Sequence, residues 1–325
     1  MSLIRKCKQL ILFFGLSLIT LVHAQVPIAG GAPIKLIVPF TPGTGIDMIA
    51  RTVAPKLAEK LGQPVIVDNR TGASGNIGTE AVVRAKPDGA TLLVTVNTIV
   101  MNRALYPKLG FDPVNDLTPI SLAAWGELVF VVPESSPYKS ASQFIEAAKT
   151  KPGKLTYASP GVGTPHHLAM ELLKNVTNIS VLHIPYKGTG PAVTDLLGAQ
   201  VDAMFLPIHV AMTYIKSGKL RALAIGSSKR HPSAPQIATF KELKIGQIDV
   251  DMWYGFMAPK GLNGDDLNKI ANALHQILQE PDIKNIFATQ GLDPAVSSSQ
   301  VFKALIDKDA KRWERLIKSQ GIVAD

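Results

Sequence analysis

Cysteine is almost absent from this chain of 325 residues, because Cys7 is its single cysteine. That residue precedes the apolar run Leu10 to Val22, whereas the cysteine of a lipid anchor would follow such a run. The sequence therefore excludes a disulfide framework and argues against an acyl anchor. An exported protein without disulfides fits a bacterial periplasm.

The chain also lacks an apolar run long enough to span a membrane. The run from Leu10 to Val22 has 13 residues, against the roughly 20 that a spanning helix needs. Basic residues precede the run, and small residues occupy the two cleavage-determining positions, Val22 and Ala24. We therefore expect a signal peptide of residues 1–24, cleaved after Ala24, and a mature protein in the periplasm.

Aromatic residues are scarce, at 6 %, and the positive charges are dispersed although the net charge is +9. Three of these charges belong to the expected signal peptide, so the excess on the mature chain is modest. No zinc-finger or RNA-recognition signature is present, which argues against nucleic acid as a partner. A mildly positive surface fits the attraction of small anions.

Hydrophobic residues make up 46 % of the chain, which is enough for a large core and two domains. Short apolar runs alternate with helical patterns, and this alternation indicates an α/β fold with largely parallel sheets. The expected strands are 34–39, 65–68, 92–96, 128–132, 155–158, 181–184, 203–206 and 222–225. The expected helices are 47–61, 77–86, 141–150, 165–174, 191–197, 210–216, 265–279 and 300–319.

Two strand-turn-helix segments repeat the pattern Pro-Gly-x-Gly, at Pro42 to Gly45 and, 118 residues later, at Pro160 to Gly163. Neither continues into the phosphate loop G-x-x-x-x-G-K-[ST] or the dinucleotide pattern G-x-G-x-x-G. A turn of this kind brings backbone N–H groups to the start of a helix, where an anion is favoured. The plainer interpretation is a tight turn without a ligand.

Long stretches of the sequence resemble the Bug-type extracytoplasmic solute receptors, the substrate-binding components of tripartite tricarboxylate transporters. The resemblance covers nearly all of the mature chain and is carried by VPFTPGTGIDMIAR, KPGKLTYASPGVGTPHHLAMELLK, HIPYKGTGPAVTDLLGAQVDAMF and WYGFMAPKG, among others. It implies a two-lobed periplasmic binding protein of the Venus-flytrap, type II-like class, in which each lobe is a mostly parallel sheet flanked by helices. Lobe one would comprise residues 25–125 and 227–325, and lobe two residues 126–226.

The resemblance also implies a function without catalysis, cofactor or metal. The ligand would be a small carboxylate, and the partners would be the membrane subunits of a tripartite tricarboxylate-type transporter, with the receptor itself a monomer. Backbone N–H groups of the two loops would hold the carboxylate, helped by the hydroxyls of threonine and serine. The loop residues are Phe40, Thr41, Pro42, Gly43, Thr44, Gly45, Ile46 and Asp47 in lobe one, and Ser159, Pro160, Gly161, Val162, Gly163, Thr164 and His167 in lobe two.

Three of these loop residues have a second interpretation or depart from the family pattern. Asp47 suits capping of its own helix with Arg51 one turn on, because a carboxylate repels an anion. The family pattern has a glycine where this chain has Thr44 and a hydroxyl residue where it has Ile46. We hypothesise that Ile46 favours a ligand with an apolar or aromatic portion beside its carboxylate.

Four residues outside the loops are further candidates for the ligand site. Thr95 and Asn97 end an expected strand on the ligand side, Tyr186 follows another, and Asp202 precedes a third. Each has a structural alternative, as a packed side chain or a turn residue. The remaining histidines are scattered, and His183, His209, His231 and His275 are expected at the surface or in the core.

Histidine raises two other possibilities, which the spacing disfavours. His166 and His167 are adjacent, so on a helix they do not face one metal site. A hydrolase that uses Ser159 and His167 would need the G-x-S-x-G elbow, which SPGVG is not. A closer alternative to transport is a ligand sensor that signals to a membrane partner, which the sequence does not distinguish from a transport receptor.

Overall fold

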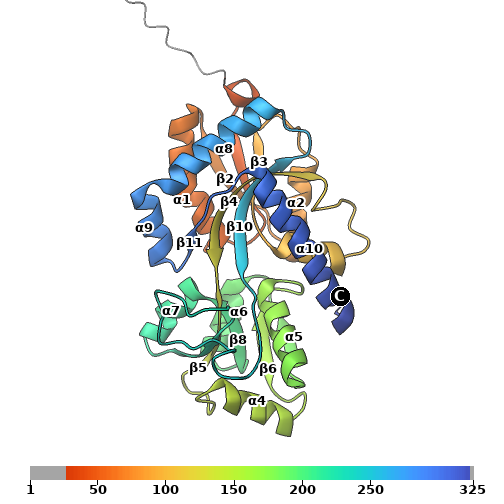
Figure 1. Cartoon of the computed structure of the whole chain (residues 1–325), viewed down its shortest axis with the longest axis vertical. Coiled ribbons are helices and arrows are strands. Elements are labelled where there is room, and N and C mark those ends of the chain that lie inside the picture. Colours follow the sequence, from red (N-terminus) through yellow and green to blue (C-terminus); the bar gives the residue numbers. More distant parts are fainter. Residues whose placement is uncertain (1–26, 323–325) are drawn as a thin grey trace, which may run out of the picture.

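The computed structural model describes residues 27–322, so the expected signal peptide and its cleavage site lie outside the described residues. Figure 1 shows two lobes, one above the other, each with a sheet and flanking helices. The two-lobed α/β fold expected from the sequence is confirmed.

The first lobe contains a six-stranded sheet in the order β11-β4-β10-β3-β1-β2. Strands β1, β2 and β3 are parallel, whereas β10 runs antiparallel to β3 and β4, and β11 runs antiparallel to β4. The strands are β1 (Ile34–Val38), β2 (Val65–Asn69), β3 (Thr91–Val96), β4 (Leu117–Gly126), β10 (Met252–Pro259) and β11 (Asp293–Pro294).

The second lobe contains a five-stranded sheet in the order β7-β6-β8-β5-β9. Strands β6, β7 and β8 are parallel, and β5 runs antiparallel to β8 and β9. The strands are β5 (Leu128–Pro133), β6 (Thr156–Ser159), β7 (Leu182–Pro185), β8 (Ala203–Pro207) and β9 (Leu220–Ile225).

Helices cover both sheets, and four of them matter most for the site. These are α1 (Gly45–Leu61) and α3 (Thr98–Leu105) of the first lobe, and α5 (Pro165–Thr177) and α7 (Ile208–Lys216) of the second. The others are η1 (Ile28–Gly31), η2 (Ala73–Gly75), α2 (Asn76–Val83), α4 (Ala141–Thr150), α6 (Thr189–Leu197), α8 (Gly264–Gln279), α9 (Pro281–Thr289) and α10 (Ser299–Gln320). Among the described residues no helix is both long and apolar enough to cross a membrane.

The polypeptide passes between the lobes twice, from β4 to β5 and from the segment after β9 to β10. That segment stays with the second sheet, because the Phe240 ring lies 6.0 Å from Phe130 and 5.8 Å from Phe205, centroid to centroid. The Val250 N–H also donates to the Gly226 carbonyl. The chain therefore rejoins the first sheet only at Met252.

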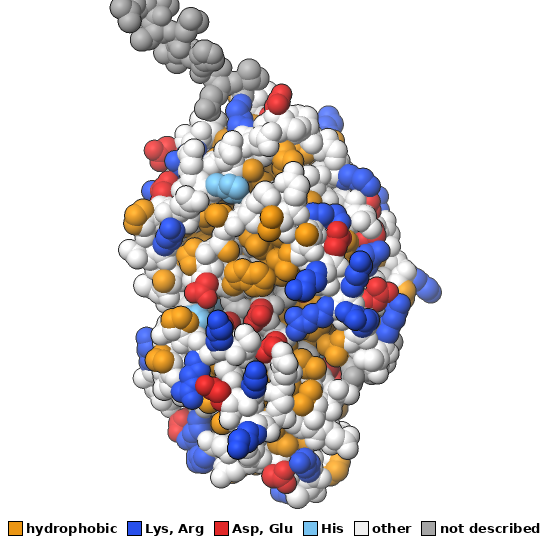
Figure 2. Space-filling view, in the orientation of Figure 1, with side chains coloured by type: hydrophobic (Ala, Val, Ile, Leu, Met, Phe, Trp, Pro, Cys, Tyr) orange, Lys and Arg blue, Asp and Glu red, His pale blue; other side chains and the backbone are white. Residues whose placement is uncertain are grey.

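Positive charge collects on one flank of the molecule. On the face in Figure 2, Lys and Arg side chains gather at the right, where α10 lies in Figure 1. The sequence of α10 is rich in both residues, SQVFKALIDKDAKRWERLIKSQ.

Candidate functional site

The first Pro-Gly-x-Gly loop leads into α1, and the N-cap residue Thr44 makes no side-chain hydrogen bond to this helix. Thr44 precedes α1, and its hydroxyl donates to the Thr41 carbonyl at 3.0 Å instead of accepting an N–H of the helix. The Gly43 N–H donates to the Asp47 carboxylate at 2.9 Å. Gly43 has φ +82°, a conformation that favours glycine. The first N–H groups of α1 thus keep no partner within the helix.

The second loop has the same construction before α5. The Thr164 hydroxyl donates to the Gly161 carbonyl at 2.8 Å, and the Gly163 N–H donates to Nδ1 of His167 at 3.1 Å. Gly163 has φ +77°, close to the value at Gly43. Thr164 likewise leaves its helix uncapped.

These contacts correct the pairing of the two loops by two residues. The repeated letters Pro-Gly-x-Gly align Gly43 with Gly161, but the hydrogen bonds match Gly43, Thr44 and Asp47 with Gly163, Thr164 and His167. The pairing also matches Ile46 with His166, the second residue of each helix. The repeated letters do not align the helices, because Pro160 lies five residues before the start of α5 whereas Pro42 lies three residues before the start of α1.

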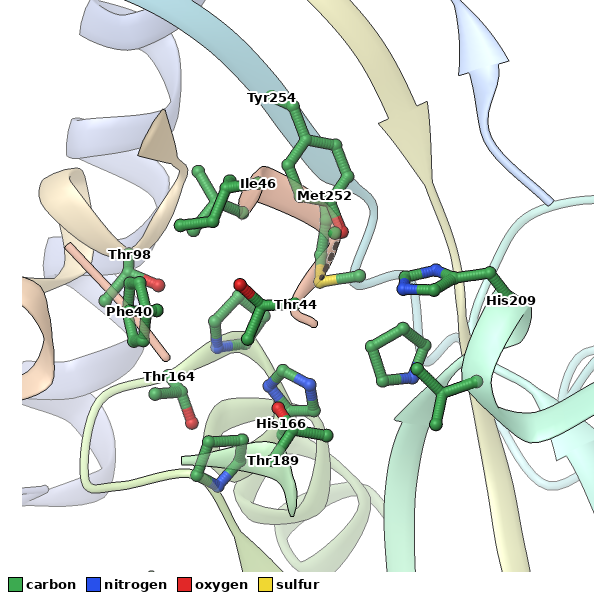
Figure 3. A pocket seen from close by; sticks show the side chains of 16 residues that line it. Phe40, Thr44, Ile46, Thr98, Thr164, His166, Thr189, His209, Met252 and Tyr254 are labelled. Carbon is green, nitrogen blue, oxygen red and sulfur yellow. Dashed lines mark hydrogen bonds between the residues drawn. The ribbon is translucent and has the colours of Figure 1, made fainter. Parts of the chain in front are cut away.

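A cavity lies where these two helix ends meet. It encloses about 480 Å³ of empty space, part of which is open to solvent. Figure 3 shows Thr44 and His166 near its centre, with Phe40 and Thr98 on one side and His209 on the other. The lining residues are Phe40, Thr44, Gly45, Ile46, Val96, Thr98, Pro160, Thr164, Pro165, His166, Thr189, Pro207, His209, Val210, Met252 and Tyr254.

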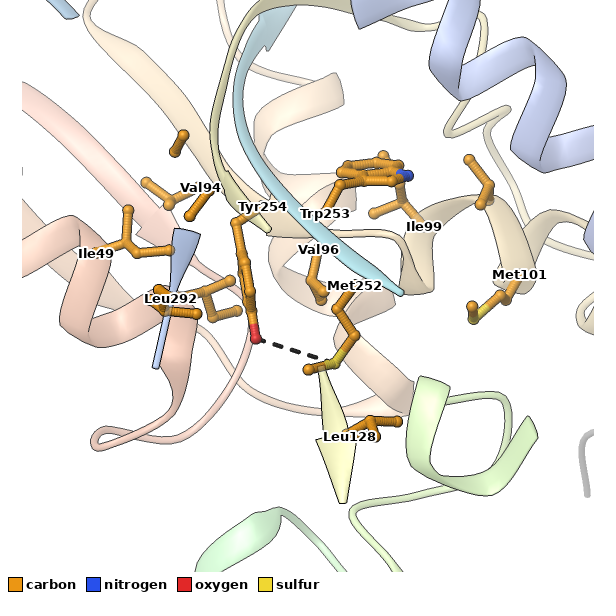
Figure 4. Packing of buried hydrophobic residues seen from close by; sticks show 14 of the residues in the cluster. Ile49, Val94, Val96, Ile99, Met101, Leu128, Met252, Trp253, Tyr254 and Leu292 are labelled. Atoms are coloured by element: carbon orange, nitrogen blue, oxygen red, sulfur yellow. Dashed lines mark hydrogen bonds between the residues drawn. The ribbon is translucent and has the colours of Figure 1, made fainter. Parts of the chain in front are cut away.

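Strand β10 contributes both to the wall of this cavity and to the buried core of the first lobe. Met252 and Tyr254 face the cavity, and the Tyr254 hydroxyl contacts the Met252 sulfur at 3.9 Å (Figures 3 and 4). Trp253 points to the opposite side, because side chains alternate along a strand. Its ring meets Phe302 edge to face at 5.1 Å, and its Nε1–H donates to Asp309 at 2.7 Å.

Six of the residues expected in the site line this cavity, and the others lie around it. The six are Phe40, Thr44, Gly45, Ile46, Pro160 and Thr164. A neighbouring groove at the cleft is lined by Thr41, Gly161 and Tyr186, with Phe40 and Pro160 shared between the two spaces. Pro42, Gly43, Val162 and Gly163 belong to the loops without lining the cavity.

Asp47 holds the first loop in place and does not line the cavity. Its carboxylate accepts from Arg51 Nε at 3.0 Å and from Asn69 Nδ2 at 2.9 Å, in addition to Gly43. Burial by itself would raise the pKa of Asp47, but the bonds from Arg51, Gly43 and Asn69 together hold that pKa below its usual value. Its position fits the capping alternative.

His167 has the corresponding place in the second loop and is equally enclosed. Its ring lies 4.2 Å from His183 and 6.3 Å from Tyr157, stacked with both. Burial, with a smaller contribution from the nearby Lys174, lowers the pKa of His167 to about 4. A neutral ring can accept the Gly163 N–H, so His167 fixes the loop from behind.

Ser159 is fully buried, and its hydroxyl contacts His183 Nε2 at 2.7 Å and the Gly161 carbonyl at 3.0 Å. His167 is bonded to Gly163, so the pair required by the hydrolase alternative is not brought together.

Thr95, Asn97 and Asp202 do not line the cavity. The Thr95 hydroxyl donates to the Val96 carbonyl, and Asn97 Nδ2 donates to the Asp251 carbonyl at 2.9 Å, beside the second passage between lobes. The Asp202 carboxylate accepts from the N–H and hydroxyl of Thr156, at the start of β6.

Sequence reasoning missed two histidines that line the cavity, His166 on α5 and His209 on α7. Both ring nitrogens of each are buried and have no hydrogen-bond partner among residues 27–322. Burial lowers the pKa of His166 to about 3, with a contribution from His209, and burial lowers the pKa of His209 to about 4. Both imidazoles are therefore neutral at pH 7. No group of His, Cys, Asp or Glu in the described part of the chain could hold a metal ion.

Comparison with known proteins points to one family. The family model described as tripartite tricarboxylate transporter family receptor matches residues 49–322. Protein BugT of Bordetella pertussis is 35% identical over 291 residues, which is 89% of this chain and 89% of BugT. The structure of periplasmic binding protein BugD has a TM-score of 0.85 and 31% identity, over 90% of this chain and 99% of that one.

Two similar solved structures are named together with a ligand. Rpa4515 of R. palustris with adipate has a TM-score of 0.86 at 29% identity and covers 90% of this chain and 99% of its own. MatC of Rhodopseudomonas palustris with bound malate has a TM-score of 0.82 at 29% identity and covers 88% of this chain and 99% of its own.

Proposed function

Because the chain belongs to the tripartite tricarboxylate transporter receptor family, we propose that it captures a small carboxylate between its lobes and delivers it to the membrane subunits of such a transporter. The observation that carries this proposal is the pair of uncapped helix ends, α1 and α5, that meet at one cavity from opposite lobes. Adipate and malate, named with two relatives, are carboxylates.

Magnitudes explain why both lobes take part. One helix terminus stabilises an anion by roughly 0.3 to 1 kcal/mol, and by up to about 2 when partly buried. Micromolar affinity needs about 8 kcal/mol. Several charge-assisted hydrogen bonds of roughly 1.5 to 3 kcal/mol each, from N–H groups such as those of Gly45 and His166, reach this range once closure excludes water.

The mechanism is a population shift toward the closed form. Contacts from both lobes to one ligand exist only when the lobes are closed, so the ligand favours closure by its differential affinity. The closed lobes then present the loaded receptor to its membrane partners. Neither covalent chemistry nor a metal ion is needed for this cycle.

The proposal also includes the boundary between the lobes and the cleavage of the signal peptide. We assign residues up to about 250 to the second lobe, in place of the boundary at 226, a division supported by the packing of Phe240 on the second sheet. The exported receptor is cleaved after Ala24 and acts as a monomer in the periplasm.

Native mass spectrometry of the mature protein, purified from periplasm, tests the ligand class. We expect a co-purified acid, and calorimetry on that acid should give micromolar affinity or better. Small-angle scattering should show a more compact particle with the acid than without it. A co-purified sugar or inorganic phosphate, with no acid that binds, would contradict the proposal.

Uptake in the source bacterium separates transport from sensing. Deletion of the transporter's membrane subunits should abolish uptake of the acid while the purified receptor still binds it. Unchanged uptake after that deletion would favour a sensor that signals to another membrane partner.

A further inference from the structure

The cavity between the lobes is lined without a charged side chain. Among the described residues around it, Lys, Arg, Asp and Glu are all missing, and Phe40, Ile46 and Met252 give it apolar walls. Positive potential comes instead from the amino ends of α1 and α5. The cavity is therefore suited to one negative charge, placed where those two helices begin.

Unpaired polar atoms surround the rest of the cavity. His166 is 8% exposed, and neither of its ring nitrogens has a partner among residues 27–322. The same holds for both ring nitrogens of His209 and for the hydroxyl of Thr98, which is 2% exposed and reaches the cavity from the first lobe. Figure 3 shows the His166 and His209 rings directed toward the space between the labelled side chains.

A neutral imidazole offers one donor and one acceptor. Buried polar atoms in native proteins are almost always paired, and leaving them unpaired is costly. A ligand that supplies an uncharged donor or acceptor to these rings removes that cost on binding. A hydroxyl fits both functions, because it can donate to one ring nitrogen and accept from the N–H of another.

A second carboxylate is poorly matched to the same place. It would be removed from water beside neutral imidazoles and apolar side chains, without a cation to balance it. The ligand would then need to bring a proton with it, because burial keeps His166 and His209 uncharged near pH 7.

We infer that the ligand is a monocarboxylate whose apolar body carries an uncharged hydrogen-bonding group, such as a hydroxyl, that faces His166 and His209. This inference rests on the proposed carboxylate function and adds the class of acid. Its carboxylate lies at the helix ends, its body lies against Ile46 and Phe40, and its polar group lies toward α7. The ligand thereby differs from adipate and malate, which have two carboxylates.

Calorimetry with matched pairs of acids tests the number of charges. Benzoate and terephthalate differ by a second carboxylate on one ring, and hexanoate and adipate differ in the same way on one aliphatic chain. In each pair of which a member binds, we expect the monocarboxylate to bind at least tenfold more tightly than the dicarboxylate. Tighter binding of terephthalate, adipate or malate would overturn the inference and leave the proposed function standing.

A second comparison tests the hydrogen-bonding group. We expect 3-hydroxybenzoate or 4-hydroxybenzoate to bind at least tenfold more tightly than benzoate. This advantage should fall below threefold in His209→Leu and His166→Leu and be partly kept in His209→Gln, which retains a donor and an acceptor. A structural role of the histidines would change all affinities together and leave the ratio intact, and that result would overturn the inference.

Ile46→Thr supplies a matched test of the apolar wall. We expect it to lower the affinity for benzoate relative to hexanoate, and an unchanged ranking would count against the placement of the body. If none of these acids binds while the protein melts cooperatively, the inferred acid class fails, whereas the carboxylate function is decided by the co-purified ligand.

Discussion

Gly45 is a residue of the cavity at which the closed cleft has little room. It begins α1, and a Cβ atom at this position would lie 3.0 Å from the Tyr254 hydroxyl and 3.2 Å from His209 Cε1. His209 belongs to the opposite lobe, so an added methyl group would hold the lobes apart. We expect Gly45→Ala to weaken ligand binding about tenfold or more, which corresponds to about 1.4 kcal/mol, and to leave the melting temperature nearly unchanged.

The matched control is Gly264→Ala at the first residue of α8. No atom lies within 4 Å of a Cβ there, so we expect affinity and stability close to those of the natural protein. Calorimetry on the co-purified acid compares the two variants. Equal affinities would show that closure tolerates the methyl group and that the cleft is wider than described.

The sequence around His209 does not indicate that this residue lines the cavity. Its helix, α7, follows β8, and nothing in its apolar pattern indicates that the opposite lobe closes over its first turn. In the sequence, His166 suggests only a metal site together with its neighbour His167. The two rings point to different sides of α5, one to the cavity and one to the Tyr157 stack.

At the scale of elements, η2 of the first lobe makes a hydrogen bond to the second lobe. Ser74 has φ +52° and follows Ala73 at +46°, both unusual for residues other than glycine. Asn102 Nδ2 donates to the Ser74 carbonyl at 2.9 Å, and Tyr106 donates to its hydroxyl at 3.3 Å. The Ser74 hydroxyl in turn donates to the Val162 carbonyl at 2.7 Å, across the cleft.

This contact predicts that Ser74→Ala weakens ligand binding without touching the ligand. The bond exists only in the closed form, so its loss should cost about 0.5 to 1.5 kcal/mol, or roughly 2- to 12-fold in affinity. Ser217→Ala is the control, because that hydroxyl bonds only within α7. An affinity that falls equally in both variants would remove the interlobe contact as the cause.

Most elements could be predicted from periodicity, and those missed have physical reasons. Helices α1, α5 and α8 begin within two residues of the expected positions. Helices α3 and α9 and strand β11 were not predicted. Strands β4 and β10 were also missed, because Pro119 and Gly255 interrupt their strand pattern. Both are antiparallel partners near the passages between lobes, and such pairing depends on the return of a distant segment.

At the scale of the whole molecule, carboxylates gather where the chain passes between the lobes. Glu127 lies between β4 and β5, and Asp251 immediately precedes β10. Burial, with contributions from Asp251 and Asp293 and against a bond from the Ser227 hydroxyl, raises the pKa of Glu127 to about 7. Burial also raises the pKa of Asp251. The folded protein thus favours the protonated form of Glu127.

The sign of the resulting pH dependence follows from linkage. The pKa of Glu127 is higher in the folded than in the unfolded chain, so its stabilising effect is complete below about pH 4.3 and is lost as the pH rises toward 7. The loss is of the order of 1 to 3 kcal/mol.

We expect the melting temperature to fall more between pH 5 and about pH 7.5 in the natural protein than in Glu127→Gln, which stays uncharged. Glu146→Gln, on the exposed face of α4, controls for the change in net charge and should keep the original slope. If Glu127→Gln keeps that slope as well, Glu127 does not cause the pH dependence of stability.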